Sequence, residues 1–169
     1  MDCDLRKATI SRYLRIPRSH AGLTNVITSK DEGALATALV RVKDSGITVL
    51  TAGTIPPNPT ELLSAPMTEK IFASLQKAFD YVIVDTPPVS LVTDAAVLCR
   101  MADGVLLVVR PGVTTIQSAQ LSKRTWSRQR PHPGCCHERL QRQAERRRDG
   151  YSYAYSYSYY DEDKKGNDA

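Results

Sequence analysis

The chain has 169 residues, of which 41% are hydrophobic and 24% are charged, and its formal net charge is +5. This composition excludes a wholly disordered chain, a collagen-like repeat and a disulfide-rich miniprotein, and the length suits about one domain. No apolar run approaches the ~20 residues that a membrane-spanning helix needs. Met1 is followed by Asp2, Cys3 and Asp4 rather than by the apolar stretch of a secretory signal. We therefore expect neither a membrane-spanning helix nor a secretory signal.

The positive charge is concentrated in one segment of the chain. Residues 124–148 contain eight Arg and two Glu, whereas the remaining residues contain 15 basic and 16 acidic side chains. A basic surface over the whole protein is therefore not expected. The net charge gives no reason to predict a nucleic-acid partner.

The composition divides the chain into three parts. Residues 1–123 alternate apolar runs with amphipathic stretches and are predicted to form the folded core. Residues 124–150 are rich in Arg, Gln and Pro and poor in aliphatic side chains, which favours a disordered segment. Residues 151–169 begin with a Tyr/Ser repeat and end in charged and polar residues, which is typical of a mobile low-complexity tail.

Helices and strands are predicted to alternate through the first part. The strands are apolar on both faces, which suits a parallel sheet covered by helices on each side. The sequence therefore predicts an α/β fold with right-handed crossover connections. In chain order, the expected elements are a helix at 33–44, a strand at 47–50, a helix at 65–79, a strand at 81–84, a helix capped by Thr93, and a strand at 104–109.

Acidic residues at the carboxyl ends of such strands are candidate ligand-binding residues. Asp85 directly follows the strand at 81–84 and precedes Thr86-Pro87-Pro88, so its carboxylate could hold a hydrated Mg²⁺ or simply satisfy a turn. Asp2 and Asp4 lie two residues apart and share a face if the backbone is extended. This pair could share a metal, act as a base, or remain solvated.

Five segments resemble, in order and spacing, the bacterial tyrosine kinases of polysaccharide export. The resemblance covers residues 1–123 and 149–160. One such segment is a weak signal, whereas five in the same order are specific. The segments are Asp2-Cys3-Asp4-Leu5-Arg6, Pro56-Pro57-Asn58-Pro59-Thr60-Glu61-Leu62-Leu63, Val82-Ile83-Val84-Asp85-Thr86-Pro87-Pro88, Val92-Thr93-Asp94-Ala95, and the tyrosine cluster at 151–160.

This resemblance implies a P-loop NTPase fold of the deviant Walker type, here an incomplete doubly wound parallel sheet with a disordered C-terminal tail. The segment that begins at Asp2 resembles the Walker A′ motif, and the one that contains Asp85 resembles Walker B. Asp2 and Asp4 are expected to hold Mg²⁺ and to activate the attacking tyrosine hydroxyl. Asp85 is expected to bind the metal through water, and Arg6 to lie near the phosphates of ATP and a subunit contact. The expected phosphorylation sites are Tyr151, Tyr153, Tyr155, Tyr157, Tyr159 and Tyr160.

The same resemblance implies an activity, partners and a location. The activity is that of an ATP-dependent protein-tyrosine autokinase, a transferase that regulates the synthesis and export of capsular polysaccharide or exopolysaccharide. The expected partners are further copies of the chain, a membrane adaptor that regulates polysaccharide chain length, and a tyrosine phosphatase, with no nucleic acid. The expected location is the cytoplasm, at the inner face of the cell membrane through the adaptor.

Two departures from the family pattern bear on activity. No G-x-x-x-x-G-K-[S/T] motif occurs in the sequence, and none of the nine Gly residues precedes a Lys. We therefore expect a chain truncated before Met1, without the phosphate-binding loop and its strand, and inactive alone. The family pattern is also lost at residues 124–148 and resumes at residue 149. We interpret this window as translated out of frame between two compensating shifts.

Other interpretations of the same residues are less favoured. His132, Cys135, Cys136 and His137 lack the C-x₂-C spacing of a zinc site, and the Arg-rich segment lacks the interleaved aromatic residues of an RNA-binding region. The period-2 tyrosines could form an edge strand. A partition or division-site ATPase is not expected to carry the Pro56–Leu63 run or the tyrosine cluster. The remaining alternative to a kinase is a non-catalytic remnant or substrate module whose tyrosine tail an intact kinase phosphorylates.

Overall fold

The computed structural model describes residues 1–43, 45–89, 91–110, 112–127 and 134–136. The six predicted phosphorylation sites and the two histidines at 132 and 137 lie outside these residues, as does most of the Arg-rich segment. The described part is a mixed helix-and-strand fold. Its elements are α1 (Ile10–Tyr13), α2 (Leu23–Thr28), α3 (Ala34–Ala38), β1 (Leu39–Arg41), β2 (Thr48–Leu50), α4 (Pro59–Leu63), α5 (Pro66–Ala78), α6 (Asp94–Leu98), β3 (Gly104–Leu106), α7 (Ile116–Ser127) and β4 (Gly134–Cys136).

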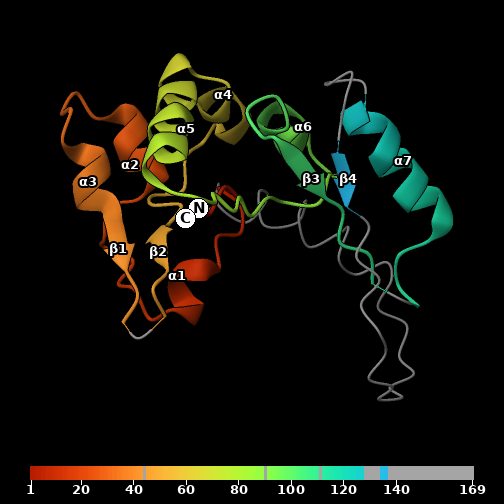
Figure 1. The fold of residues 1–169 in the computed structure, drawn as a ribbon, viewed down its shortest axis with the longest axis horizontal. Coiled ribbons are helices and arrows are strands. Elements are labelled where there is room, and N and C mark those ends of the chain that lie inside the picture. Colours follow the sequence, from red (N-terminus) through yellow and green to blue (C-terminus); the bar gives the residue numbers. More distant parts are fainter. Residues whose placement is uncertain (44, 90, 111, 128–133, 137–169) are drawn as a thin grey trace, which may run out of the picture.

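The N-terminus lies in the middle of the described fold. Figure 1 shows α2 and α3 beside α5 at one end of the molecule, and β3, β4 and α7 at the other end. The segment that joins α5 to α6 crosses between these two parts, next to the N-terminus. The first residues of the chain are therefore placed to contact both β2 and the segment after α5.

Residues 1–3 pair with two segments at once through their backbone. On one side they contact the end of β2, and on the other they run parallel to residues 83–85, with a bridge between Asp2 and Asp85. This pairing leaves the extended segment after α5 joined to the core. The hydrogen bonds run from the Asp2 nitrogen to the Leu50 carbonyl oxygen at 2.9 Å, from Met1 to Ile83 at 2.7 Å, from Asp85 to Met1 at 2.9 Å, and from Cys3 to Asp85 at 2.8 Å.

The described strands do not form the single parallel sheet that the sequence predicts. β1 pairs antiparallel with β2, and β3 pairs parallel with β4. Residues 81–84 are extended but form no strand of either sheet, and the strand predicted at 104–109 is limited to β3. Tyr81 is 89% exposed and Ile83 is 82% exposed. Alternate apolar side chains are therefore exposed where burial on both faces was expected, because no described helix covers that face.

Two predicted helices differ in their bounds from the observed ones. The helix predicted at 33–44 is wrong beyond Ala38, where the chain enters β1 and turns back into β2. The turn uses Gly46, whose positive φ of 68° favours glycine, and the Val42 nitrogen donates to the Ile47 carbonyl oxygen. The helix expected after Thr93 is α6, which ends at Leu98, and Thr93 occupies the N-cap position without a side-chain capping bond.

The core is built against α5, the helix predicted at 65–79. Pro66 stands in the first turn of α5, where its missing N–H costs no hydrogen bond. The inward face of α5 buries Ile71, Phe72 and Leu75. The other core side chains come from the N-terminal segment, α2, β2, α4 and α6, and they include Leu5, Leu23, Val26, Leu50, Leu63 and Leu98.

Two glycines allow α2 to pack against the segment that leads into α4. A Cβ atom on Gly22 would lie 2.3 Å from the Gly53 nitrogen, and Gly53 itself has a φ of 83°. The nitrogens of Leu23 and Thr24 donate to the carbonyl oxygens of Thr51 and Ala52. This close approach fixes the path of the chain from β2 toward the Pro56–Leu63 run.

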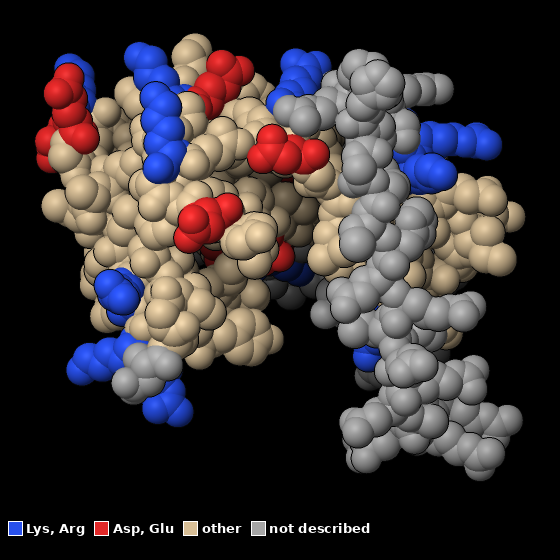
Figure 2. Space-filling view, in the orientation of Figure 1, with Lys and Arg blue, Asp and Glu red and all other residues tan. Residues whose placement is uncertain are grey.

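Charged side chains are dispersed over the face of the molecule drawn in Figure 2. Lys and Arg lie mainly around its edge, with Asp and Glu between them, and no single basic patch is seen on this face. Within the described ranges, every helix is too short or too polar to cross a bilayer.

The exposed position of residues 81–84 predicts unequal costs for two truncations. Leu50 is 1% exposed, so Leu50→Ala is expected to lower the free energy of unfolding by about 2–5 kcal/mol. Ile83→Ala is expected to change it by no more than about 0.5 kcal/mol, because that side chain is already in water. Urea unfolding of both variants measures the difference. Equal costs would mean that the face of Ile83 is covered in solution.

Candidate functional site

The pairing of residues 1–3 with residues 83–85 brings separate acidic residues to one place. Asp2 and Asp85 are partners across the parallel bridge, although 83 positions separate them in the chain. Asp4 follows two residues after Asp2. Because parallel segments end at the same edge, the three carboxylates predicted from the sequence lie near one another.

Asp2 is fully buried and is held by backbone donors. Its Oδ1 accepts the N–H of Asp4 at 3.2 Å, and its Oδ2 accepts that of Ile10 at 3.4 Å. Burial raises the pKa of Asp2 to about 6, the two hydrogen bonds oppose this rise, and the charges of Asp85 and Asp4 add to it. Asp2 is therefore anchored in the fold rather than presented at the surface.

Asp4 and Asp85 are more accessible than Asp2. Asp4 is half-buried, and its Oδ1 accepts the backbone N–H groups of Arg6 at 3.1 Å and Lys7 at 2.9 Å. Asp85 is exposed. Partial desolvation raises the pKa of Asp85, and the charge of Asp4 raises it further. The carboxylates therefore repel one another, and a cation placed beside them would relieve that repulsion.

A Mg²⁺ ion beside these carboxylates would have to keep part of its water shell. In the part of the chain that the structure describes, no three His, Cys, Asp or Glu side chains are arranged to hold a metal between them. Magnesium at nucleotide sites commonly takes one or two carboxylates and completes its shell with water and phosphate oxygens. Of the three carboxylates, those of Asp4 and Asp85 reach the surface and that of Asp2 does not.

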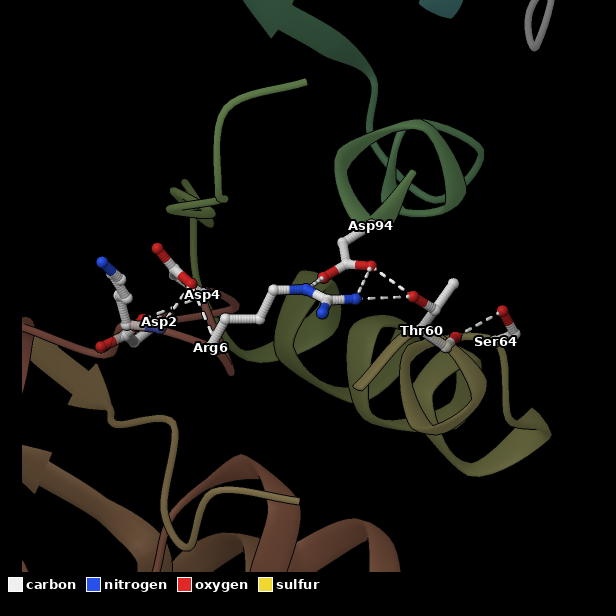
Figure 3. Close-up of polar contacts among 7 residues, drawn as sticks. Asp2, Asp4, Arg6, Thr60, Ser64 and Asp94 are labelled. Carbon is white, nitrogen blue, oxygen red and sulfur yellow. Dashed lines mark hydrogen bonds and ion pairs between the residues drawn. The ribbon is translucent and has the colours of Figure 1, made fainter. Parts of the chain in front are cut away.

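Arg6 extends away from the carboxylates, toward α4 and α6 (Figure 3). Its Nε donates to Asp94 Oδ2 at 2.9 Å, and its terminal nitrogen donates to Thr60 Oγ1 at 3.1 Å and to Asp94 Oδ1 at 3.3 Å. The sequence predicted Arg6 near the nucleotide phosphates. In the structure its guanidinium lies against these two helices, and its expected place near the phosphates and a subunit contact stays a prediction. Sequence analysis missed the contact, although Thr60 and Asp94 stand in two of the segments that carry the resemblance.

Cys3 lies between the two acidic residues but is not a candidate nucleophile. Its side chain is fully buried. Burial raises the pKa of the Cys3 thiol to about 12, so the thiol stays protonated at neutral pH. The residue contributes to the core and to the backbone pairing with Asp85.

Comparisons with known proteins give a consistent result. The tyrosine-protein kinase YwqD of Bacillus subtilis is 37% identical to the chain over 123 residues, which are 73% of this chain and 51% of YwqD. The kinase domain of VpsO superposes with a TM-score of 0.74 at 30% identity, over 83% of this chain and 68% of that domain. The kinase domain of the Escherichia coli tyrosine kinase ETK gives a TM-score of 0.73 at 31% identity, over 89% of this chain and 58% of that domain.

The buried carboxylate of Asp2 predicts a pH-dependent stability. Because its pKa is raised from 3.8 to about 6, the folded state holds this proton more tightly than the unfolded chain does. The Asp2 carboxyl therefore lowers the free energy of unfolding as pH rises from about 4 to about 6. Its pKa shift corresponds to a loss of about 3 kcal/mol. We expect Asp2→Asn to lose less stability than the unchanged chain over this interval, as measured by urea unfolding. Asp80→Asn, at an exposed position, is the control. Identical pH curves for Asp2→Asn and the unchanged chain would contradict the burial of this charge.

The chain spans about half the length of the curated relatives that it matches first. No family model matches it. It nevertheless covers more than two thirds of the VpsO kinase domain at 30% identity, and YwqD and ETK are named as tyrosine kinases. The resemblance inferred from the sequence is thereby confirmed: the chain belongs to the bacterial tyrosine kinase family.

Proposed function

We propose that the described fold forms the carboxylate side of a Mg²⁺–ATP site in a protein-tyrosine autokinase. The observation that carries the proposal is the parallel bridge between Asp2 and Asp85, which collects three acidic residues at one edge. Their mutual repulsion favours a divalent cation at that edge. In this proposal the kinase regulates the synthesis and export of capsular polysaccharide or exopolysaccharide, as the family resemblance implies.

Each acidic residue has a separate task in this proposal. Asp4 and Asp85 would hold the metal, and Asp85 would do so through water. The metal, when bound, supplies positive charge against the phosphate oxygens of ATP. Asp4 is also the better placed of the two N-terminal carboxylates to accept the proton of a tyrosine hydroxyl, because Asp2 is buried. Asp2 orients Asp4 by accepting its backbone N–H.

The proposed acceptors are the six tyrosines between residues 151 and 160, which lie outside the described residues. Each phosphate adds about −1.5 to −2 charges, so six would add on the order of −10. Charge of this size would repel neighbouring subunits in a ring of such chains. A membrane adaptor that regulates chain length and a tyrosine phosphatase are the further partners proposed, with a location at the inner face of the cell membrane.

The alternative proposal is that the chain is an acceptor and not a catalyst. Two sequence features favour it: the tyrosine cluster is present, and no G-x-x-x-x-G-K-[S/T] motif occurs in the 169 residues. Backbone N–H groups and a Lys of that motif would otherwise hold the β- and γ-phosphates. An intact kinase would then phosphorylate the tail of this chain.

Phosphotyrosine formation tests whether this chain catalyses the transfer by itself or accepts phosphate from another kinase. We expect the purified chain with Mg²⁺ and ATP to give a signal no higher than background, because its sequence has no motif to hold the phosphates. With the kinase domain of ETK added, we expect phosphate on the tyrosines at 151–160, mapped by mass spectrometry. A variant with these six tyrosines changed to Phe controls for phosphorylation elsewhere.

The Asp85→Ala variant distinguishes a chain that catalyses phosphate transfer from a chain that only accepts phosphate. If the chain only accepts phosphate, this change leaves the reaction with added kinase unaltered. Strong self-phosphorylation of the unchanged chain, abolished by Asp85→Ala, would refute inactivity and establish the chain as a complete kinase. Failure of the added kinase to modify the tail would refute the acceptor proposal.

A further inference from the structure

Arg6, Thr60 and Asp94 form a buried contact that joins three distant segments of the chain. The Asp94 carboxylate is 0% exposed, while the Arg6 side chain that pairs with it is 31% exposed. The Thr60 hydroxyl donates to Asp94 Oδ1 and accepts from Arg6. Figure 3 shows Thr60 on α4 and Asp94 beside it on α6, with Arg6 reaching both from the N-terminal segment. We call this the Arg6–Asp94–Thr60 contact.

The three segments are held by this contact at a junction of two helices. α4 and α6 pack against each other. The Nε and terminal nitrogen of Arg6 engage both oxygens of Asp94, which is the two-point geometry that a guanidinium allows and an ammonium does not. The side chain of Arg6 therefore fixes the N-terminal segment relative to both helices.

The backbone of Arg6 takes part in a second set of bonds. Its N–H and that of Lys7 donate to the same oxygen of Asp4, at 3.1 Å and 2.9 Å. Asp4 in turn donates its own N–H to Asp2. One residue therefore anchors the segment through its side chain and orients the Asp4 carboxylate through its backbone.

We propose that the Arg6–Asp94–Thr60 contact positions the Asp4 carboxylate. Arg6 then supports the carboxylate site by anchoring the N-terminal segment, and does not act as a phosphate ligand. This inference rests on the proposed function, in which Asp4 holds Mg²⁺. Thr60 and Asp94 are then positioning residues of that site. Outer partners of this kind commonly change metal affinity by about 10- to 100-fold when they are removed.

Two substitutions weaken the contact without removing its buried carboxylate. Thr60→Val keeps the shape of the side chain and removes the hydroxyl, and Arg6→Lys keeps the charge and removes the two-point geometry. Ser64→Ala is the matched control. Its hydroxyl lies one turn along from Thr60 and donates to the Thr60 carbonyl oxygen, outside the contact.

The first readout is amide hydrogen exchange at Arg6 and Lys7 in the folded full chain. If the contact orients Asp4, both amides exchange at least about tenfold faster in Thr60→Val and Arg6→Lys, because their bonds to Asp4 open more often. Ser64→Ala leaves their exchange unchanged. Unaltered protection in both test variants would overturn the inference, whatever their melting temperatures.

The second readout is binding of Mn²⁺ alone, measured by electron paramagnetic resonance, with Asp4→Asn as the variant that removes the ligand itself. We expect the two test variants to bind about tenfold more weakly than the unchanged chain and Ser64→Ala. Variants that melt earlier but bind Mn²⁺ as the unchanged chain does would show a purely structural contact and overturn the inference. If the unchanged chain binds no Mn²⁺ while the amides of Arg6 and Lys7 lose protection in the variants, the proposed metal site fails and the positioning of Asp4 stands.

Discussion

The carboxylate of Asp94 lies at a depth where an uncompensated charge would cost several kcal/mol. It is tolerated because Arg6 and Thr60 donate to both of its oxygens. These partners are 88 and 34 positions away in the chain, so the charge is compensated only when the N-terminal segment, α4 and α6 are together. A different packing of the two helices would leave the buried carboxylate without donors. The ion pair thereby disfavours other packings of α4, α6 and the N-terminal segment, whatever its net contribution to the stability of the fold.

The same N-terminal segment also organises the acidic edge. Residues 1–3 lie between β2 and residues 83–85, and their backbone bonds place Asp2 beside Asp85. Burial raises the pKa of both Asp2 and Asp85, and the neighbouring carboxylates raise it further. Displacing this segment would therefore disturb the ion pair and the acidic edge together, because Arg6 is bonded to both. Because of this coupling, the Arg6–Asp94–Thr60 contact can affect the orientation of the carboxylates at the acidic edge.

Part of this arrangement is visible in the sequence, and part is not. The apolar period of α5 and the short β-branched run of β2 are local signals, and the structure agrees with both. The proximity of Asp2 and Asp85 was expected only from the family resemblance, which assigns both residues to one Mg²⁺ site, and the bridge between them agrees with it. The segment at 33–44 has a helical apolar period, yet residues 39–41 pair with β2, and only that tertiary pairing decides the outcome. The exposure of Ile83 depends on which elements cover a face, and the partners of Asp94 depend on contacts between distant segments. Neither can be deduced from the pattern of one chain.

Asp2, Asp4 and Arg6 lie two residues apart but have different surroundings, because the backbone bends at residues 5–7. Asp2 is buried and fixed by backbone donors, Asp4 is half-buried, and Arg6 points toward α4 and α6. Asp2 and Arg6 therefore hold the segment in place, and Asp4 carries its more accessible carboxylate. A conservative change at Asp2 or Arg6 removes a support, whereas a change at Asp4 removes the carboxylate that we propose as a metal ligand. The two effects differ in kind: the first alters how well the Asp4 carboxylate is oriented, and the second alters whether it is there. Loss of function at all three positions would consequently not imply that all three side chains touch the nucleotide.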